Sequence, residues 1–225
     1  MPPNCRSGGA VLFDLDGTLI DTAPELADAV NRLRQEHALN PLPFLAIRPH
    51  VSHGASALVR IGLSLDPNDA VFPARRQRLL EIYDSVLATE ARLFRGMEDV
   101  LSRLDQQAIP WGIVTNKPGW LTRPLLERLG ILSRAGCVIA GDTLAKRKPD
   151  PDPLLLGAEL LARAPRQCVY VGDAECDVIA AKRAGMRVLI ALFGYLGPDD
   201  RPESWGADAL IECPGAILEW LNHSI

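Results

Sequence analysis

The sequence of 225 residues lacks several features that mark particular classes of protein. No apolar run reaches the roughly 20 residues that span a bilayer, and the first residues, MPPNCRSGG, contain no hydrophobic core of a secretion signal. The net charge of −4 shows no positive excess of the kind that binds nucleic acid or an anionic membrane surface. We therefore expect a cytoplasmic protein without a nucleic-acid or membrane partner.

Cysteine is scarce and has no recognisable pattern. The five cysteines are an odd number, and no two of them form a CxxC pair. We therefore expect neither a disulfide framework nor a thiolate zinc site, and a reducing compartment fits best. Cys176 lies in an acidic motif, but no histidine is near it in sequence, so we interpret it as a bystander rather than a nucleophile.

What the chain does contain is an ordinary globular composition, with 48% hydrophobic and 23% charged residues. Short apolar runs typical of buried strands alternate with helical patterns. The runs cover residues 10–13, 111–114, 137–140, 168–171, 188–192 and 209–211. Strands that alternate with helices predict a parallel sheet covered on both faces, which is a doubly wound, Rossmann-like α/β core.

One stretch breaks this alternation. Residues 23–91 contain only helical patterns, and roughly 70 residues far exceed an ordinary crossover connection. We expect a small α-helical cap domain over residues 22–91, inserted into a core formed by residues 1–21 and 92–225. Thr22 and Glu25 have the spacing of a capping box, which predicts the start of the first cap helix.

The first strand ends in two carboxylates. In VLFDLDGTLIDT, Asp14 and Asp16 follow the apolar run, and the alternation of side chains along a strand places them on one face. Open α/β sheets bind ligands at the carboxyl ends of their strands. Two anions this close repel each other and lose hydration on burial, so a cation has to hold them. The alternative, a solvated Asp-Gly turn, leaves three further motifs unexplained.

Two of those motifs carry groups that can bind phosphate. VTNKP ends a strand in a hydroxyl and an amide, so Thr115 and the backbone N–H groups after it can hold phosphate oxygens. KPDP contains Lys148 in a loop stiffened by proline, and its ammonium can neutralise both phosphate and carboxylate. Its neighbours Lys146 and Arg147 are expected to face solvent.

The fourth motif, GDAECD, places Asp173 at a strand end and Asp177 one helical turn later. Asp177 has a second interpretation, as an acidic residue favoured by the dipole at a helix N-terminus. The four motifs together bring three or four carboxylates and one lysine to one sheet edge. Oxygen ligands without His or Cys favour a hard cation, usually Mg²⁺. The predicted reaction class is metal-assisted phosphoryl transfer.

The set DLDGT, VTN, KP and GDxxxD, in this order and over the whole chain, resembles the haloacid dehalogenase superfamily. The helical insertion resembles the small α-helical cap of that superfamily. The resemblance implies that Asp14 is a nucleophile that forms an aspartyl phosphate, and that Asp16 is the general acid and base. An acid at position 16 argues against a dehalogenase.

The resemblance also implies the remaining roles. The phosphoryl group would be bound by Thr115, Asn116 and Lys148. Mg²⁺ would be bound by Asp14, Asp173 and the main-chain carbonyl of Asp16. Asp177 would lie behind the metal or bind it through water.

The substrate is less determined. VTNKP with FGYLGPDD and WGAD resembles the phosphoglycolate phosphatase branch, whereas RLFRGM, WGIVTNKP and GYLGPDDRPESWGAD resemble bacterial N-acetylmuramic acid 6-phosphate phosphatases. We expect a Mg²⁺-dependent hydrolase of phosphoglycolate phosphatase type, acting on a small phosphorylated metabolite. The alternatives are an N-acetylmuramic acid 6-phosphate phosphatase and a phosphoglucomutase-like phosphotransferase.

The cap is expected to govern that choice, through His53 and Gly54. A non-catalytic binding protein on this fold is disfavoured, because Asp14, Asp16 and Lys148 are all present. The sequence is compatible with either a monomer or a homodimer.

Overall fold

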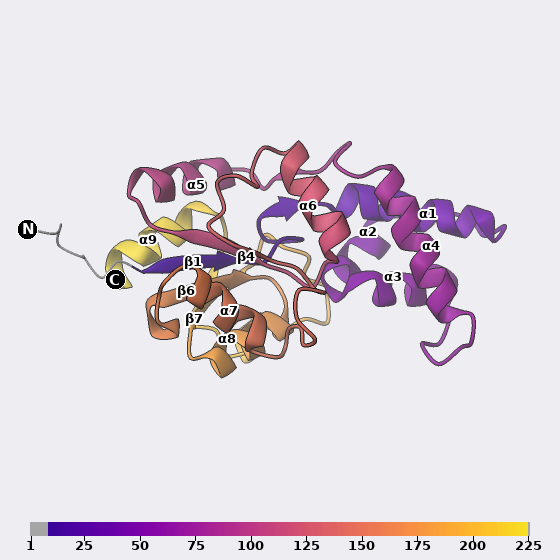
Figure 1. Cartoon of the computed structure of the whole chain (residues 1–225). Helices are drawn as coiled ribbons and strands as arrows, with labels where there is room; N and C mark the ends of the chain where they lie inside the picture. Colours follow the sequence, from indigo (N-terminus) through magenta and orange to yellow (C-terminus); the bar gives the residue numbers. More distant parts are fainter. Residues whose placement is uncertain (1–8, 225) are drawn as a thin grey trace, which may run out of the picture.

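The computed structural model describes residues 9–224, which are built around a six-stranded sheet (Figure 1). All neighbouring strands in it are parallel. Across the sheet the order is β5 (Val138–Ile139), β4 (Trp111–Val114), β1 (Ala10–Phe13), β6 (Cys168–Gly172), β7 (Arg187–Ala191) and β8 (Ala209–Ile211). The predicted parallel α/β sheet is confirmed, and β1 lies between β4 and β6.

The strand ends differ slightly from the expected ones. β5 lies at the edge of the sheet, pairs with β4 alone and is reduced to two residues. β6 continues to Gly172, which pairs with Ile190 of β7.

Helices cover both faces of the sheet (Figure 1). On one face, α5 (Met97–Gln106), α6 (Gly119–Arg128) and α9 (Gly215–Ser224) share a buried cluster with Phe13. On the other, α7 (Asp152–Leu160) and α8 (Glu175–Ala184) share a cluster with Leu12. The successive side chains of β1 thus enter different cores, as the period of a strand requires. The short 3₁₀ turns η2 (Pro165–Gln167) and η3 (Pro202–Ser204) complete the core elements.

A helical insertion lies at one end of the molecule, beyond the sheet (Figure 1). It consists of α1 (Ala23–Glu36), α2 (Phe44–Ile47), the 3₁₀ turn η1 (Arg48–His53), α3 (Gly54–Leu63) and α4 (Phe72–Ser85). An antiparallel ribbon of β2 (Ile20–Asp21) and β3 (Arg92–Leu93) joins its two ends. The expectation of helices without a strand over residues 23–91 is confirmed, whereas domain boundaries at residues 22 and 91 remain a prediction. The ribbon was missed because two-residue strands carry no periodic signal.

The predicted capping box at the start of α1 is wrong. Thr22 makes no side-chain cap. Its hydroxyl instead donates to Oδ1 of Asp16 at 2.6 Å. Glu25 accepts from the backbone N–H groups of Glu90 and Ala91, at 2.7 and 2.8 Å. Both side chains therefore serve tertiary contacts that local spacing cannot reveal. No helix within residues 9–224 is both long and apolar enough to cross a membrane.

Candidate active site

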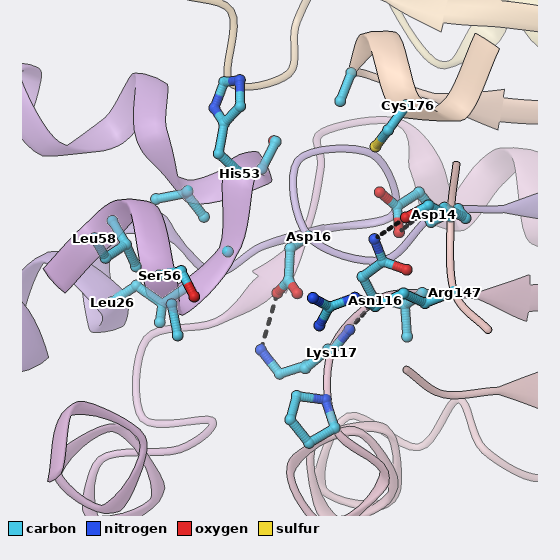
Figure 2. Close-up of a pocket in the computed structure, with 18 of the residues that line it drawn as sticks. Asp14, Asp16, Leu26, His53, Ser56, Leu58, Asn116, Lys117, Arg147 and Cys176 are labelled. Atoms are coloured by element: carbon cyan, nitrogen blue, oxygen red, sulfur yellow. Dashed lines mark hydrogen bonds and ion pairs between the residues drawn. The ribbon is translucent and has the colours of Figure 1, made fainter. Parts of the chain in front are cut away.

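The carboxyl ends of three adjacent strands meet at one cavity of about 530 Å³, which the helical insertion closes from the other side. β1 leads into Asp14 and Asp16, β4 into the segment from Thr115 to Lys117, and β6 into Asp173. Figure 2 shows Asp14, Asp16, Lys117 and His53 around this space. The cavity therefore lies where the parallel topology predicts a ligand site.

Asp14 is buried and held by a buried cation. Its Oδ1 lies 2.8 Å from Nζ of Lys148 and accepts from the backbone N–H of Leu15 at 2.7 Å. Burial raises the pKa of Asp14 to about 8; the ion pair with Lys148 opposes that shift, while Asp177 and Asp173 add to it. One lysine thus supplies too little positive charge to offset the burial of this carboxyl.

Lys148 is the positive centre of the cluster. Its ammonium contacts Asp14, Oδ1 of Asp177 at 2.8 Å and the hydroxyl of Tyr170 at 2.8 Å. Burial by itself lowers the pKa of Lys148, but the two carboxylates outweigh it and raise the pKa well above the usual range. The predicted phosphate-neutralising lysine is therefore a permanently charged group at the base of the cavity.

Asp173 and Asp177 are both buried beside Asp14. Oδ2 of Asp177 accepts from the backbone N–H groups of Asp173 and Ala174, at 3.1 and 3.0 Å, while its Oδ1 binds Lys148. Asp177 thus makes the helix N-terminal contacts of one interpretation, and its contact with Lys148 is one that the sequence did not predict. Burial, followed by repulsion from Asp177, raises the pKa of Asp173 to about 7.

The insertion reaches the cluster through Ser52. Its hydroxyl donates to Oδ2 of Asp173 at 2.6 Å, and the backbone N–H of Tyr195 donates to the same oxygen at 2.8 Å. Gly17 lies so close that a Cβ there would stand 2.2 Å from Oδ2 of Asp173, and its φ is +85°. Only glycine satisfies both constraints, which accounts for the glycine of DLDGT.

A metal cation fits this donor set. Asp14, Asp173 and Asp177 each offer a carboxylate oxygen, and these oxygens lie within 4.8 Å of one another. Three buried carboxyls face one lysine, and two of them have strongly raised pKa values. A second cation would restore their charge, and the all-oxygen donors favour a hard ion.

Asp16 is held by a different lysine, which the sequence interpretation missed. Oδ1 of Asp16 lies 3.0 Å from Nζ of Lys117, and only 5% of that lysine side chain is exposed. The same ammonium lies 2.8 Å from the hydroxyl of Tyr83 on α4. The position of Lys117 inside VTNKP was the available signal, but its partner Asp16 is distant in sequence.

Thr115 and Asn116 lie at the end of β4 and line the cavity. Oγ1 of Thr115 accepts from the backbone N–H of Lys117 at 3.1 Å, which turns the chain at the cavity wall. Nδ2 of Asn116 donates to the carbonyl of Lys148 at 3.0 Å, so this amide ties the second motif to the third. Asn116 therefore supports the loop that carries Lys148.

The insertion contributes His53 and Gly54 to the lining, and their role in substrate choice remains a prediction. Lys146 and Arg147 are exposed as predicted, although Arg147 also borders the cavity. Cys176 lines it too, but burial followed by the Asp177 charge raises the pKa of its thiol to about 12. A protonated thiol is a poor nucleophile, which agrees with the bystander interpretation.

Both the core and the insertion also contribute large aliphatic side chains to the lining. These are Leu26, Val51, Leu58, Leu80, Leu121 and Ile179. The cavity thus has a charged base at the sheet and an apolar wall beyond it.

Comparison with known proteins agrees with this geometry. A phosphoglycolate phosphatase from Xanthomonas campestris pv. campestris is 45% identical over 213 residues, covering 93% of this chain and 95% of that protein. An N-acetylmuramic acid 6-phosphate phosphatase from Pseudomonas putida is 37% identical over 216 residues, covering 96% of this chain and 97% of that protein.

A solved structure shows the same fold. The crystal structure of a predicted phosphoglycolate phosphatase from Haemophilus somnus superposes with a TM-score of 0.84 at 24% identity, covering 96% of this chain and 98% of the other. Residues 11–191 match the model of the haloacid dehalogenase-like hydrolases. The chain therefore belongs to the haloacid dehalogenase-like hydrolase family.

Proposed function

We propose that this protein is a Mg²⁺-dependent phosphomonoester hydrolase that works through an aspartyl phosphate on Asp14. The observation that carries the proposal is the separation of two carboxylates in one cavity. Asp14 is paired with Lys148 beside two further buried aspartates, whereas Asp16 is paired with Lys117. Two carboxylates in such different surroundings can take two different chemical roles.

Asp14 acts as the nucleophile in this mechanism. All of its described hydrogen bonds run to Oδ1, which leaves Oδ2 to attack phosphorus. Lys148, at 2.8 Å from Asp14, supplies positive charge where the transferred phosphoryl oxygens gather. Thr115 lies at the same cavity wall and offers a hydroxyl to that group.

Asp16 moves the proton. In protonated form it gives a proton to the oxygen of the departing alcohol, and it then takes one from the water that attacks the aspartyl phosphate. Lys117 and Thr22 both contact Oδ1 of Asp16. Oδ2 is therefore the oxygen that is available for proton transfer.

Mg²⁺, when bound, supplies the positive charge that draws the phosphoryl oxygens and Asp14 together. Asp14 and Asp173 would hold it, with the main-chain carbonyl of Asp16. Asp177 already contacts Lys148 and two backbone N–H groups. It would therefore lie behind the two metal-binding carboxylates or bind the metal through water. The raised pKa values of Asp14 and Asp173 support a requirement for this second cation.

The substrate class in this proposal is a small phosphorylated metabolite, with phosphoglycolate as the first candidate because of the 45% identical relative. The cavity favours the second candidate, N-acetylmuramic acid 6-phosphate. About 530 Å³ with an apolar wall is well within the range of sites for ring-sized ligands and far exceeds what a two-carbon acid fills. Free thiols at Cys137, Cys168, Cys176 and Cys213 suit a reducing compartment such as the cytoplasm.

Phosphate release from purified protein tests this function. We expect release from both candidate substrates with Mg²⁺, and borohydride reduction during turnover should convert Asp14 to homoserine, detectable by mass spectrometry. Isomerisation of glucose 1-phosphate with a bisphosphate primer, without net phosphate release, would instead indicate a phosphotransferase. Absence of both activities would refute the proposal.

A further inference from the structure

We propose that Arg76 on α4 binds a carboxylate of the substrate's leaving group, so that the enzyme selects phosphomonoesters that carry a second anionic group. The inference rests on the proposed phosphatase function and adds the substrate class and the residue that recognises it. It extends the site beyond His53 and Gly54, the insertion residues singled out in the sequence.

Arg76 is the unpaired permanent cation on the insertion side of the cavity. Of the residues within 9–224 that line it, Arg76 is the one arginine or lysine that the helical insertion supplies. The two lysines of the lining are already bound, Lys117 to Asp16 and Lys148 to Asp14. Arg76 is half-buried and makes no ion pair or hydrogen bond with its side chain in the described part of the chain. A guanidinium in that state is ready to bind a carboxylate with two parallel hydrogen bonds.

The position of Arg76 along α4 sets the distance that a substrate must span. Arg76, Leu80 and Tyr83 all line the cavity, and the spacing of four and three residues is one face of a helix. Tyr83 marks the inner end of this face, because its hydroxyl contacts Lys117, which contacts Asp16. A rise of 1.5 Å per residue puts the Arg76 backbone about 10 Å further along the helix. Leu80 provides an apolar surface between the two polar ends.

Substrate chemistry matches this arrangement. The two relatives described above are named as phosphatases of phosphoglycolate and of N-acetylmuramic acid 6-phosphate. Both compounds are phosphate esters of organic acids. In phosphoglycolate three bonds of about 1.5 Å hold the carboxylate about 4 Å from phosphorus. A hexose ring between phosphate and acid increases that separation and places apolar ring faces beside Leu80. From this spacing we expect the sugar acid to reach Arg76 better than the two-carbon acid.

A second arginine, Arg147, lines the cavity from the core and not from the insertion. Arg147 is exposed and directly precedes Lys148, so it borders the cavity near the phosphoryl end. We expect its charge to act on the phosphate that every substrate shares, and discrimination by a second anion to depend on Arg76.

Two matched substrate pairs test the inference with the full-length protein and Mg²⁺. The first pair is N-acetylmuramic acid 6-phosphate and N-acetylglucosamine 6-phosphate, which lacks the acid side chain; the second is phosphoglycolate and ethyl phosphate. For Arg76→Gln we expect kcat/KM to fall about 10- to 100-fold on the acidic member of each pair. A loss of this size corresponds to the free energy that hydrogen bonds to a charged group contribute. The neutral member should change less than about 3-fold, and Arg76→Lys should recover part of the loss.

Arg75→Gln is the matched control, because it removes the same charge from the adjacent residue, which does not line the cavity. The pair that shows the larger loss of kcat/KM identifies which acid Arg76 recognises. Because Arg76 and Tyr83 are about 10 Å apart along α4, we expect the larger loss for the sugar pair. Equal losses on acidic and neutral members, or no loss on either, would overturn the carboxylate site while leaving the phosphatase function intact. If wild-type protein released phosphate from none of the four compounds, the proposed function itself would fail.

Discussion

Nζ of Lys117 lies 3.0 Å from Oδ1 of Asp16, although the two residues are 101 positions apart in the chain. The pair is largely buried, with 5% of the lysine and 17% of the aspartate side chain exposed. The same ammonium reaches Tyr83 of the helical insertion at 2.8 Å. A single lysine therefore ties the proposed acid-base residue of the core to the helix that closes the cavity.

Removal of this lysine should destabilise the protein. Lys117→Met leaves Asp16 without its cation, and breaking one partner of a buried pair costs about 3 kcal/mol. Urea denaturation measures the change in the free energy of unfolding. The double variant with Asp16→Asn should recover part of the loss, because no charge is then left unpaired. The control is Lys146→Met, which removes an exposed lysine paired with Asp150 and Asp152 and should change the free energy of unfolding by less than about 1 kcal/mol. An equal loss of stability in Lys117→Met and Lys146→Met would contradict a stabilising role of the buried pair.

Asp14→Asn should abolish turnover and leave the fold intact. The amide is a poor nucleophile, so we expect steady-state phosphate release to fall about 1,000-fold or more. The change also removes one anion from a repulsive cluster, so thermal stability without metal should not decrease. Phosphate release and circular dichroism on the same preparation check both parts. Appreciable steady-state activity in this variant would exclude Asp14 as the nucleophile.

Chelation should stop catalysis, and Mg²⁺ should restore it. Zn²⁺ should be a poor substitute, because the donors are oxygens without His or Cys. Metal binding requires ionised Asp14 and Asp173, so the rise in melting temperature on addition of Mg²⁺ should be larger at pH 8 than at pH 6. Full activity in excess chelator would rule out the metal-dependent mechanism.

Stability of the metal-free protein should fall as pH rises. Folding raises the pKa of Asp14 from 3.8 to about 8 and that of Asp173 from 3.8 to about 7. The folded state therefore binds more protons than the unfolded state across this interval, and the free energy of unfolding decreases with increasing pH. The contribution of these two groups is complete below pH 3.8 and is lost as pH passes 7 and 8. Denaturant unfolding between pH 5 and pH 8 should show this slope, and Asp14→Asn should reduce it; an unchanged slope would refute the pKa assignment.

Substitution of His53 should change the ranking of substrates more than the rate of phosphoryl transfer that all substrates share. Core residues contact the phosphoryl group that all substrates share, whereas His53 lines the cavity from the insertion. We expect His53→Ala to shift the ratio of kcat/KM between phosphoglycolate and a bulky sugar phosphate by about 3-fold or more, with a smaller effect on p-nitrophenyl phosphate. Gly54 is a less clean test, since its φ of +76° strains any other residue there. A uniform effect of His53→Ala on all three substrates would argue against a role in specificity.

The sequence by itself determined the sheet and the charged base of the site. Apolar runs such as residues 10–13 and 111–114 are buried on both faces, so their residue types mark parallel strands without knowledge of their neighbours. Asp14 and Thr115 follow such a run directly, and Asp173 follows one after a single glycine. Parallel strands end at one edge, so strand position alone predicts that these side chains meet.

Only the tertiary structure decided what each polar group binds. Thr22 and Glu25 have capping-box spacing, yet they bind Asp16 and the backbone at Glu90 and Ala91, because long-range partners outweigh one local cap. Lys117 and Arg76 look like ordinary cations in the sequence. The pairing of β1 with β4 brings the first to Asp16, and α4 places the second at the cavity without an ion pair or side-chain hydrogen bond to any described residue. Pairings of this kind join positions far apart in the chain, and no local pattern of residues encodes them.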